Sequence, residues 1–325
     1  FDGFQSRGVK DPKKYWFMLR QDQIDETEKW EGSRDTIRFW SQCRGYPPPE
    51  DAVPTLIPAT MLDVHNTRKT VEWNTAPVFQ IAGMDPAYAS GGNRCVVFRI
   101  QVGTDTHGNL KLLLMKPDVI ALNVTVKDLT MSQSIARQVK KILDDNNIPL
   151  SFFGADCTAT QGAIVDAIEM EYGKTGILRI GFGGAPSDRR MSVDSEETGA
   201  DLCSNRVTEL WMNIYNFIRY DHIRGLNDDV AIELSCRSVI PGLKKRKLES
   251  KKDLIARMGF SPDLADSLAC AVAVLIERCG ILPGQKQLDT VEPEDSNAAT
   301  EQEPPRYAEN IEGDTRYHDS LAGTV

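Results

Sequence analysis

The sequence predicts an α/β protein with a mixed sheet: an antiparallel meander of three strands, then parallel strands, with helices on both faces. Two observations favour this class. Apolar runs at 77–84, 95–102 and 110–115 are separated only by short segments rich in turn residues. From residue 132 onward, apolar runs alternate with segments of helical periodicity, which is typical of parallel strands joined by helices.

The first 75 residues are polar and aromatic by turns. A helical pattern at 26–43 is followed by Pro47-Pro48-Pro49, which cannot continue a helix. We therefore expect residues 1–75 to be a linker region rather than a domain.

The elements after the meander follow in a regular order. We expect helices at 132–147, 161–172 and 205–224, and strands at 150–155, 177–182 and 230–234. A last helix is expected to begin with Ser261 as N-cap and Pro262 as its first residue, and Gly280 ends it. Together with the meander, this order predicts a ribonuclease H-like domain over residues 76–283.

Composition excludes several classes of protein. No apolar run is long enough to cross a bilayer, so no membrane partner is expected. The 7 cysteines and 4 histidines are scattered, which argues against a zinc site or a disulfide framework and leaves carboxylates as metal ligands. Much of the net charge of -9 lies in residues 284–325, an acidic tail that we expect to be disordered.

Four aspartates are candidate metal ligands. Asp85 and Asp156 each follow an apolar run, where a side chain can project beyond the end of a strand. Asp263 and Asp266 are three residues apart and share one face of the last helix. Clustered carboxylates repel one another unless a cation neutralises them, and Mg²⁺ or Mn²⁺ suits oxygen ligands.

Such a site could hold two ions and cleave a phosphodiester by activating water and stabilising the leaving oxygen. Alternatives remain open for each residue. A single aspartate at a strand end is often a turn former. The negative charge of Asp263 could simply interact favourably with the positive, N-terminal end of the helix dipole.

A basic cluster directly precedes the last helix and is a candidate DNA-binding surface. A lysine-rich loop that is merely solvated, or one that imitates a nuclear localisation patch, is the alternative interpretation. The candidate DNA-binding residues are Lys244, Lys245, Arg246, Lys247, Lys251 and Lys252.

Three motifs resemble the nuclease domain of the large terminase subunit of tailed phages. They are Gly83-Met84-Asp85-Pro86-Ala87 with Gly91-Gly92-Asn93-Arg94, then Phe153-Gly154-Ala155-Asp156, then Glu249-Ser250-Lys251 leading to Ser261-Pro262-Asp263-Leu264-Ala265-Asp266-Ser267-Leu268. The resemblance implies that Asp85, Asp156 and Asp266 are catalytic metal ligands. It also implies that Asp263 is an additional or alternative ligand, and that Lys251 lies near the site.

The resemblance further implies an endonuclease that cuts concatemeric viral DNA during genome packaging, in the cytoplasm of an infected bacterial host. Its expected partners are double-stranded DNA, the capsid portal and the small terminase subunit. Residues 1–75 resemble the end of the family's ATPase region, yet the chain has no Walker A or B motif, so the ATPase motor is expected to lie outside this chain. A junction resolvase or transposase-like nuclease, and a non-catalytic module that docks on DNA or the portal, are alternatives.

Overall fold

The structure is a computed structural model. It describes residues 3–31, 34, 39–45, 55–66, 68–88, 93–122, 129–158, 161–240 and 243–288. The part of the predicted acidic tail after residue 288 lies outside the described residues. Of the helices described, none combines the length and apolar character needed to cross a bilayer.

The centre of the fold is a 7-stranded mixed sheet in the order β6-β5-β1-β2-β3-β7, with β4 paired to β2. The strands β1, β2 and β3 form the predicted antiparallel meander, and β5 and β6 add in parallel next to β1. The predicted mixed sheet is therefore confirmed. The strands are β1 (Phe79–Asp85), β2 (Val96–Thr104), β3 (Leu110–Leu114), β4 (Asp118–Val119), β5 (Phe153–Asp156), β6 (Leu178–Ile180) and β7 (Ile223–Arg224).

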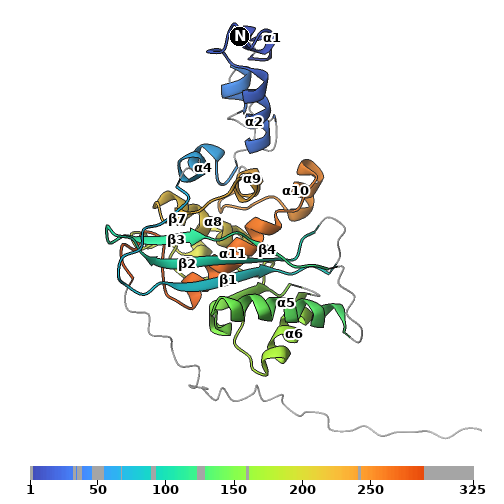
Figure 1. The fold of residues 1–325 in the computed structure, drawn as a ribbon, viewed down its shortest axis with the longest axis vertical. Helices are drawn as coiled ribbons and strands as arrows, with labels where there is room; N and C mark the ends of the chain where they lie inside the picture. Colours follow the sequence, from blue (N-terminus) through green and yellow to red (C-terminus); the bar gives the residue numbers. More distant parts are fainter. Residues whose placement is uncertain are drawn as a thin grey trace, which may run out of the picture. The chain divides into compact units, whose positions relative to one another are not determined.

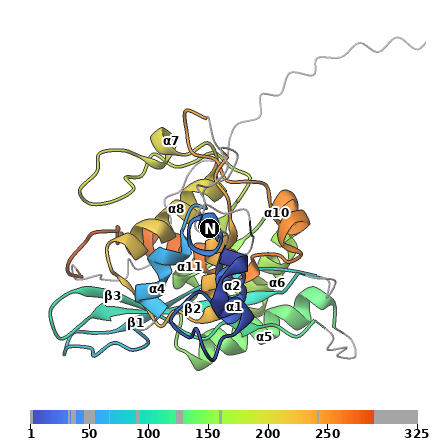
Figure 2. The same cartoon turned by 90° about the horizontal axis from the view of Figure 1, so that it is seen from above.

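Helices cover both faces of this sheet (Figure 1). One face carries α5 and α6, which lie side by side in both views (Figure 1 and Figure 2). The other face carries α11, which packs on β1, β2 and β5 and is flanked by α8 and α9. The long helices are α2 (Gln21–Glu31), α5 (Met131–Asp145), α6 (Gly162–Tyr172), α8 (Arg206–Arg219) and α11 (Asp263–Glu277); the shorter ones are α1 (Arg7–Lys10), α4 (Ala59–Asn66), α7 (Gly199–Leu202), α9 (Asp228–Cys236) and α10 (Lys251–Met258).

The alternation of side chains along β1 separates two apolar cores. Ile81 faces the core that contains α8 and α11, while Ala82 and Met84 face the core of α5 and α6. Ile57 and Leu62 are buried in the α8 and α11 core, so residues near α4 contribute to it. The expected domain boundary at residue 76 stays a prediction.

The strand expected at 230–234 is wrong, because these residues lie in α9. The Asn227 side chain accepts a hydrogen bond from the Val230 backbone, and Asp228 and Asp229 occupy the first turn, where acidic residues stabilise a helix. A short apolar run does not distinguish a buried strand from a buried helix. The N-cap residue Asn227 before this run indicates a helix, which the periodicity of the run alone does not.

Other elements differ in their limits. The helix expected at 205–224 ends at Arg219 and is followed by the short strand β7, and residues 150–152 are a 3-10 turn before β5. Within the helical pattern expected at 26–43, the structure describes the end of α2 and a π-helical turn at Trp40–Arg44. Residues 32–33 and 35–38 of that pattern lie outside the described residues.

Candidate metal centre

Asp85 and Asp156 end two neighbouring parallel strands. Met84 of β1 lies opposite Ala155 of β5, so the next residue of each strand is an aspartate at the same edge of the sheet. Both aspartates are almost fully buried. The sheet register therefore brings together the two strand-end carboxylates that the sequence singled out.

Asp263 and Asp266 lie in the first turn of α11, whose backbone packs directly on β1 at Gly83. A Cβ at Gly83 would lie 2.0 Å from the Ala271 backbone nitrogen and 2.4 Å from the Ser267 carbonyl oxygen. Only glycine permits this approach. Because the helix lies so close to the strand, its first turn reaches the strand end where Asp85 lies.

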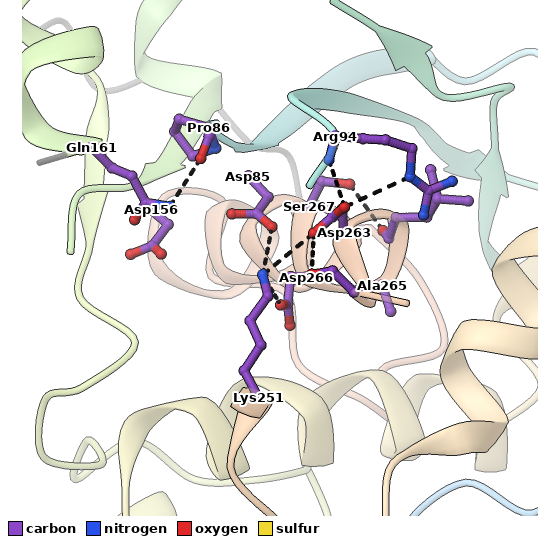
Figure 3. A network of polar contacts seen from close by, with 12 residues as sticks. Asp85, Pro86, Arg94, Asp156, Gln161, Lys251, Asp263, Ala265, Asp266 and Ser267 are labelled. Atoms are coloured by element: carbon purple, nitrogen blue, oxygen red, sulfur yellow. Dashed lines mark hydrogen bonds and ion pairs between the residues drawn. The ribbon is translucent and has the colours of Figure 1, made fainter. Parts of the chain in front are cut away.

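The Lys251 ammonium lies among three of the four carboxylates (Figure 3). Its Nζ is 3.1 Å from Asp85 Oδ2, 3.0 Å from Asp266 Oδ2 and 3.4 Å from Asp263 Oδ1. Lys251 is the first residue of α10, a helix that the sequence did not predict and that begins at the N-cap Ser250. The structure thus places Lys251 at the site itself.

Burial is the largest cause of the raised pKa values of Asp85 and Asp156. Burial, together with the neighbouring Asp266 and Asp263, raises the pKa of Asp85 well above its usual range, although Lys251 acts in the opposite direction. Burial also raises the pKa of Asp156. The pKa of Lys251 is raised by the aspartates around it, which outweigh its own desolvation. A cation between these carboxylates is therefore strongly favoured.

The donor set fits a hard divalent cation. All the candidate ligands are carboxylate oxygens, and the buried Oδ2 of Asp266 has no hydrogen-bond partner among the described residues, only the ion pair with Lys251. In their present positions, no three Asp, Glu, His or Cys side chains in the described part of the chain are arranged to hold one ion. The ammonium of Lys251 occupies the space between three of the carboxylates.

The two oxygens of Asp263 already have protein partners. Oδ2 accepts a hydrogen bond of 2.7 Å from the Arg94 backbone nitrogen, and Oδ1 accepts one from the Ser261 hydroxyl. Ser261 is thus not the N-cap that the sequence predicted: Pro262 holds that position without a side-chain cap bond, and α11 begins at Asp263. The serine hydroxyl is bound to the side chain of Asp263 instead.

The sequence did not predict the role of Glu233, a residue of α9 that caps the first turn of α11. Its buried carboxylate accepts hydrogen bonds from the backbone nitrogens of Leu264 and Ala265 and forms an ion pair with Arg94. Burial raises the pKa of Glu233 to about 7 despite these donors. Its segment was predicted as a strand, so no pattern pointed to a cap.

Trp211 and Arg237 were also missed. The Trp211 indole nitrogen donates to Asp266 Oδ1 at 3.0 Å, and Arg237 Nη1 lies 3.3 Å from the same oxygen. The periodicity of α8 predicted Trp211 only as a residue of the apolar face.

Only two residues of the predicted basic cluster, Lys247 and Lys251, line the cleft beside the site. A cleft of about 500 Å³ is lined by Asp156, Asp266, Lys247 and Lys251 together with polar residues such as Asn205. Lys244, Lys245, Arg246 and Lys252 are exposed and are not among the described residues that line this cleft. The Nζ of Lys245 donates to the Ala200 carbonyl oxygen.

Comparisons with known proteins gave structural likenesses only. No protein-family model and no curated protein matches the chain. The nuclease domain of the large terminase subunit gp2 of bacterial virus Sf6 aligns with a TM-score of 0.47 and 12% identity, over 67% of this chain and 98% of that chain. A mutant of that domain with manganese gives a TM-score of 0.45, 11% identity and the same coverage.

A second group of similar structures comes from another organism. RuvC of Thermus thermophilus aligns with a TM-score of 0.27 and 14% identity, over 61% of this chain and 95% of that chain. The antiparallel meander, the parallel strands and the helices on both faces are the architecture that the sequence predicted for a ribonuclease H-like domain.

Proposed function

We propose that this chain is a metal-dependent endodeoxyribonuclease that cuts concatemeric viral DNA during genome packaging. The observation that carries the proposal is the arrangement of three buried carboxylates around one ammonium, with a fourth carboxylate at the end of the adjacent parallel strand. Buried charges of one sign persist only where a function or a counter-ion maintains them.

Asp85, Asp156 and Asp266 would hold the metal, and Asp263 is an additional or alternative ligand. Two bound Mg²⁺ or Mn²⁺ ions would supply an activated water and a charge that stabilises the leaving oxygen. The chain itself supplies the fixed carboxylates, because β1, β5 and the first turn of α11 meet at one edge of the sheet.

Lys251 serves this site as the resident counter-ion. It neutralises part of the carboxylate charge when no metal is bound, and its charge also attracts the phosphate backbone of DNA. Lys247, on the wall of the adjoining cleft, would contact a phosphate near the bond to be cut. The exposed Lys244, Lys245, Arg246 and Lys252 would extend this contact along the duplex.

The packaging role rests on the sequence motifs that resemble terminase large subunits. Under it, the partners are double-stranded DNA, the capsid portal and the small terminase subunit, and a separate ATPase motor moves the DNA. Cutting would take place in the cytoplasm of the infected bacterium, with residues 1–75 as the link to the motor and 284–325 as an acidic tail.

Supercoiled plasmid incubated with the purified chain tests the proposal. We expect nicking and linearisation with Mn²⁺, none with EDTA, and a rate at least about 100-fold lower for Asp156→Ala, because loss of one ligand empties the site. Asp145→Ala, an exposed residue of α5, is the matched control and should cut at the wild-type rate.

Two results would count against the proposal. Wild-type protein that leaves plasmid intact in Mn²⁺, or Asp156→Ala protein that cuts equally well, would remove the nuclease assignment. Cleavage of four-way junctions but not of linear duplex would replace the packaging role with that of a junction resolvase.

A further inference from the structure

The two oxygens of Asp266 have different surroundings. Asp266 is completely buried in the first turn of α11. Oδ1 is contacted by two donors, whereas Oδ2 has only the ion pair with Lys251. A carboxylate held in this way has one orientation and offers one oxygen to a cation.

Trp211 holds Oδ1 from α8. Its indole nitrogen lies 3.0 Å from Oδ1, and the whole side chain is buried. An indole N–H has a single donor and no acceptor, so this hydrogen bond permits only one direction of approach. The ring cannot turn away from Asp266 without breaking the packing of α8 against α11.

Arg237 holds the same oxygen from the end of α9. Its Nη1 lies 3.3 Å from Oδ1, and its guanidinium carbon lies 4.9 Å from the centre of the Trp211 ring. The Arg237 side chain is buried and lines the cleft beside Lys251. This cation–π contact links the two donors, so that each helps to hold the other in place.

We propose that Trp211 and Arg237 are positioning residues that turn Asp266 Oδ2 toward the space between the carboxylates, where a divalent cation binds. The inference deepens the proposed function and rests on it for the identity of the cation. Each acts through Asp266, as the outer partners of metal ligands commonly do.

Binding of Mn²⁺ alone, measured by calorimetry without DNA, is the first test. Trp211→Phe keeps an aromatic ring, smaller than the indole, but removes the N–H donor, and Arg237→Lys keeps the charge but loses the planar fork. We expect each variant to bind Mn²⁺ about 10- to 100-fold more weakly. Trp73→Phe and Arg99→Lys, both outside the site, are matched controls and should bind as the wild type does.

Plasmid nicking at a series of Mn²⁺ concentrations separates positioning from general damage. The Mn²⁺ concentration for half-maximal rate should rise in Trp211→Phe and Arg237→Lys, while the rate at saturating Mn²⁺ recovers most of the wild-type value. A merely destabilised protein would lose rate at every Mn²⁺ concentration. If Trp211→Phe does not fold, as judged by circular dichroism, Arg237→Lys carries the same expectation.

A metal-free readout keeps the inference separate from the proposed function. In a ¹H–¹⁵N spectrum, the indole cross-peak that disappears in Trp211→Phe is that of Trp211, and it should shift in Asp266→Asn. An unmoved cross-peak, or variants with wild-type Mn²⁺ affinity, would overturn the positioning role even if the wild type cuts DNA. A wild-type protein that neither binds Mn²⁺ nor cuts DNA would overturn the proposed function. The cross-peak would then test only the orientation of the Asp266 side chain.

Discussion

Glu233 accepts a hydrogen bond of 2.7 Å from the backbone nitrogen of Leu264 and so caps α11 from a different helix. The first turn of a helix has backbone donors with no partner inside the helix, and Pro262 supplies no side chain to satisfy them. The turn that carries Asp263 and Asp266 is therefore fixed by a residue from α9.

Replacement of Glu233 should loosen this turn. Glu233→Ala removes the acceptor of two backbone donors and leaves the Arg94 guanidinium only a longer contact of 3.7 Å with Asp263, so we expect a loss of about 2–3 kcal/mol in the free energy of unfolding. Glu233→Gln keeps an acceptor and should lose less. Urea unfolding measures both, with Glu171→Ala on the surface of α6 as control. Equal stability of Glu233→Ala and the control would show that the cap is dispensable.

Gly83→Ala should separate α11 from the sheet. The new Cβ would meet helix backbone at 2.0 Å, which no side-chain movement relieves. We expect a loss of about 3 kcal/mol or more in stability, and a loss of plasmid cutting, because Asp266 moves away from Asp85. Gly181→Ala is the matched control, since nothing lies within 4 Å of its Cβ. A Gly83→Ala protein as stable as Gly181→Ala would refute this close packing.

Lys251→Met should make the fold depend on a divalent cation. Without the ammonium, three buried carboxylates repel one another, and we expect a cost of about 1–2 kcal/mol in EDTA, moderated because Lys251 is 35% exposed. Mn²⁺ should then raise the melting temperature more in Lys251→Met than in the wild type, since the cation replaces the lost charge. Lys252→Met, on the exposed side of α10, should behave as the wild type. An equal Mn²⁺ shift in all three proteins would argue that no cation takes the place of Lys251.

The free energy of unfolding should decrease as the pH falls below neutrality, because His222 is buried in its neutral form. Its Nε2 accepts from the Gly284 nitrogen, so the ring is neutral with its proton on Nδ1, which faces the Leu110 carbonyl. Burial lowers the pKa of His222 below its usual value. The unfolded chain therefore binds the proton first, and stability is lost as the pH falls through the unfolded pKa of about 6.5.

Urea unfolding at pH 7.5 and 5.5 measures this effect. The difference in stability between the two pH values should be smaller in His222→Gln than in the wild type, and unchanged in His107→Gln, which alters an exposed residue. An identical pH dependence in His222→Gln would mean that other groups cause the loss.

The sequence predicted those parts of the site that depend on local patterns. Asp85 and Asp156 follow recognisable strands, and Asp263 and Asp266 begin a recognisable helix. Trp211 and Asp266 are 55 residues apart, and Glu233 and Leu264 are 31 apart, so their contacts depend on how α8 and α9 pack against α11. Periodicity reports which side of an element is apolar and carries no information about its partner. For the same reason the apolar run at 230–234 did not reveal that it is a helix.

Asp263 and Asp266 should differ sharply when each is replaced by asparagine. Oδ2 of Asp263 is bound by the Arg94 backbone nitrogen and Oδ1 by Ser261, whereas Asp266 offers Oδ2 without a hydrogen bond. We therefore expect Asp266→Asn to lose Mn²⁺ binding and cutting by about 100-fold or more, and Asp263→Asn to lose about 10-fold, in the range of a residue that supports a ligand. Calorimetry with Mn²⁺ and plasmid nicking measure the two losses, and equal losses would make Asp263 a ligand of the same rank as Asp266.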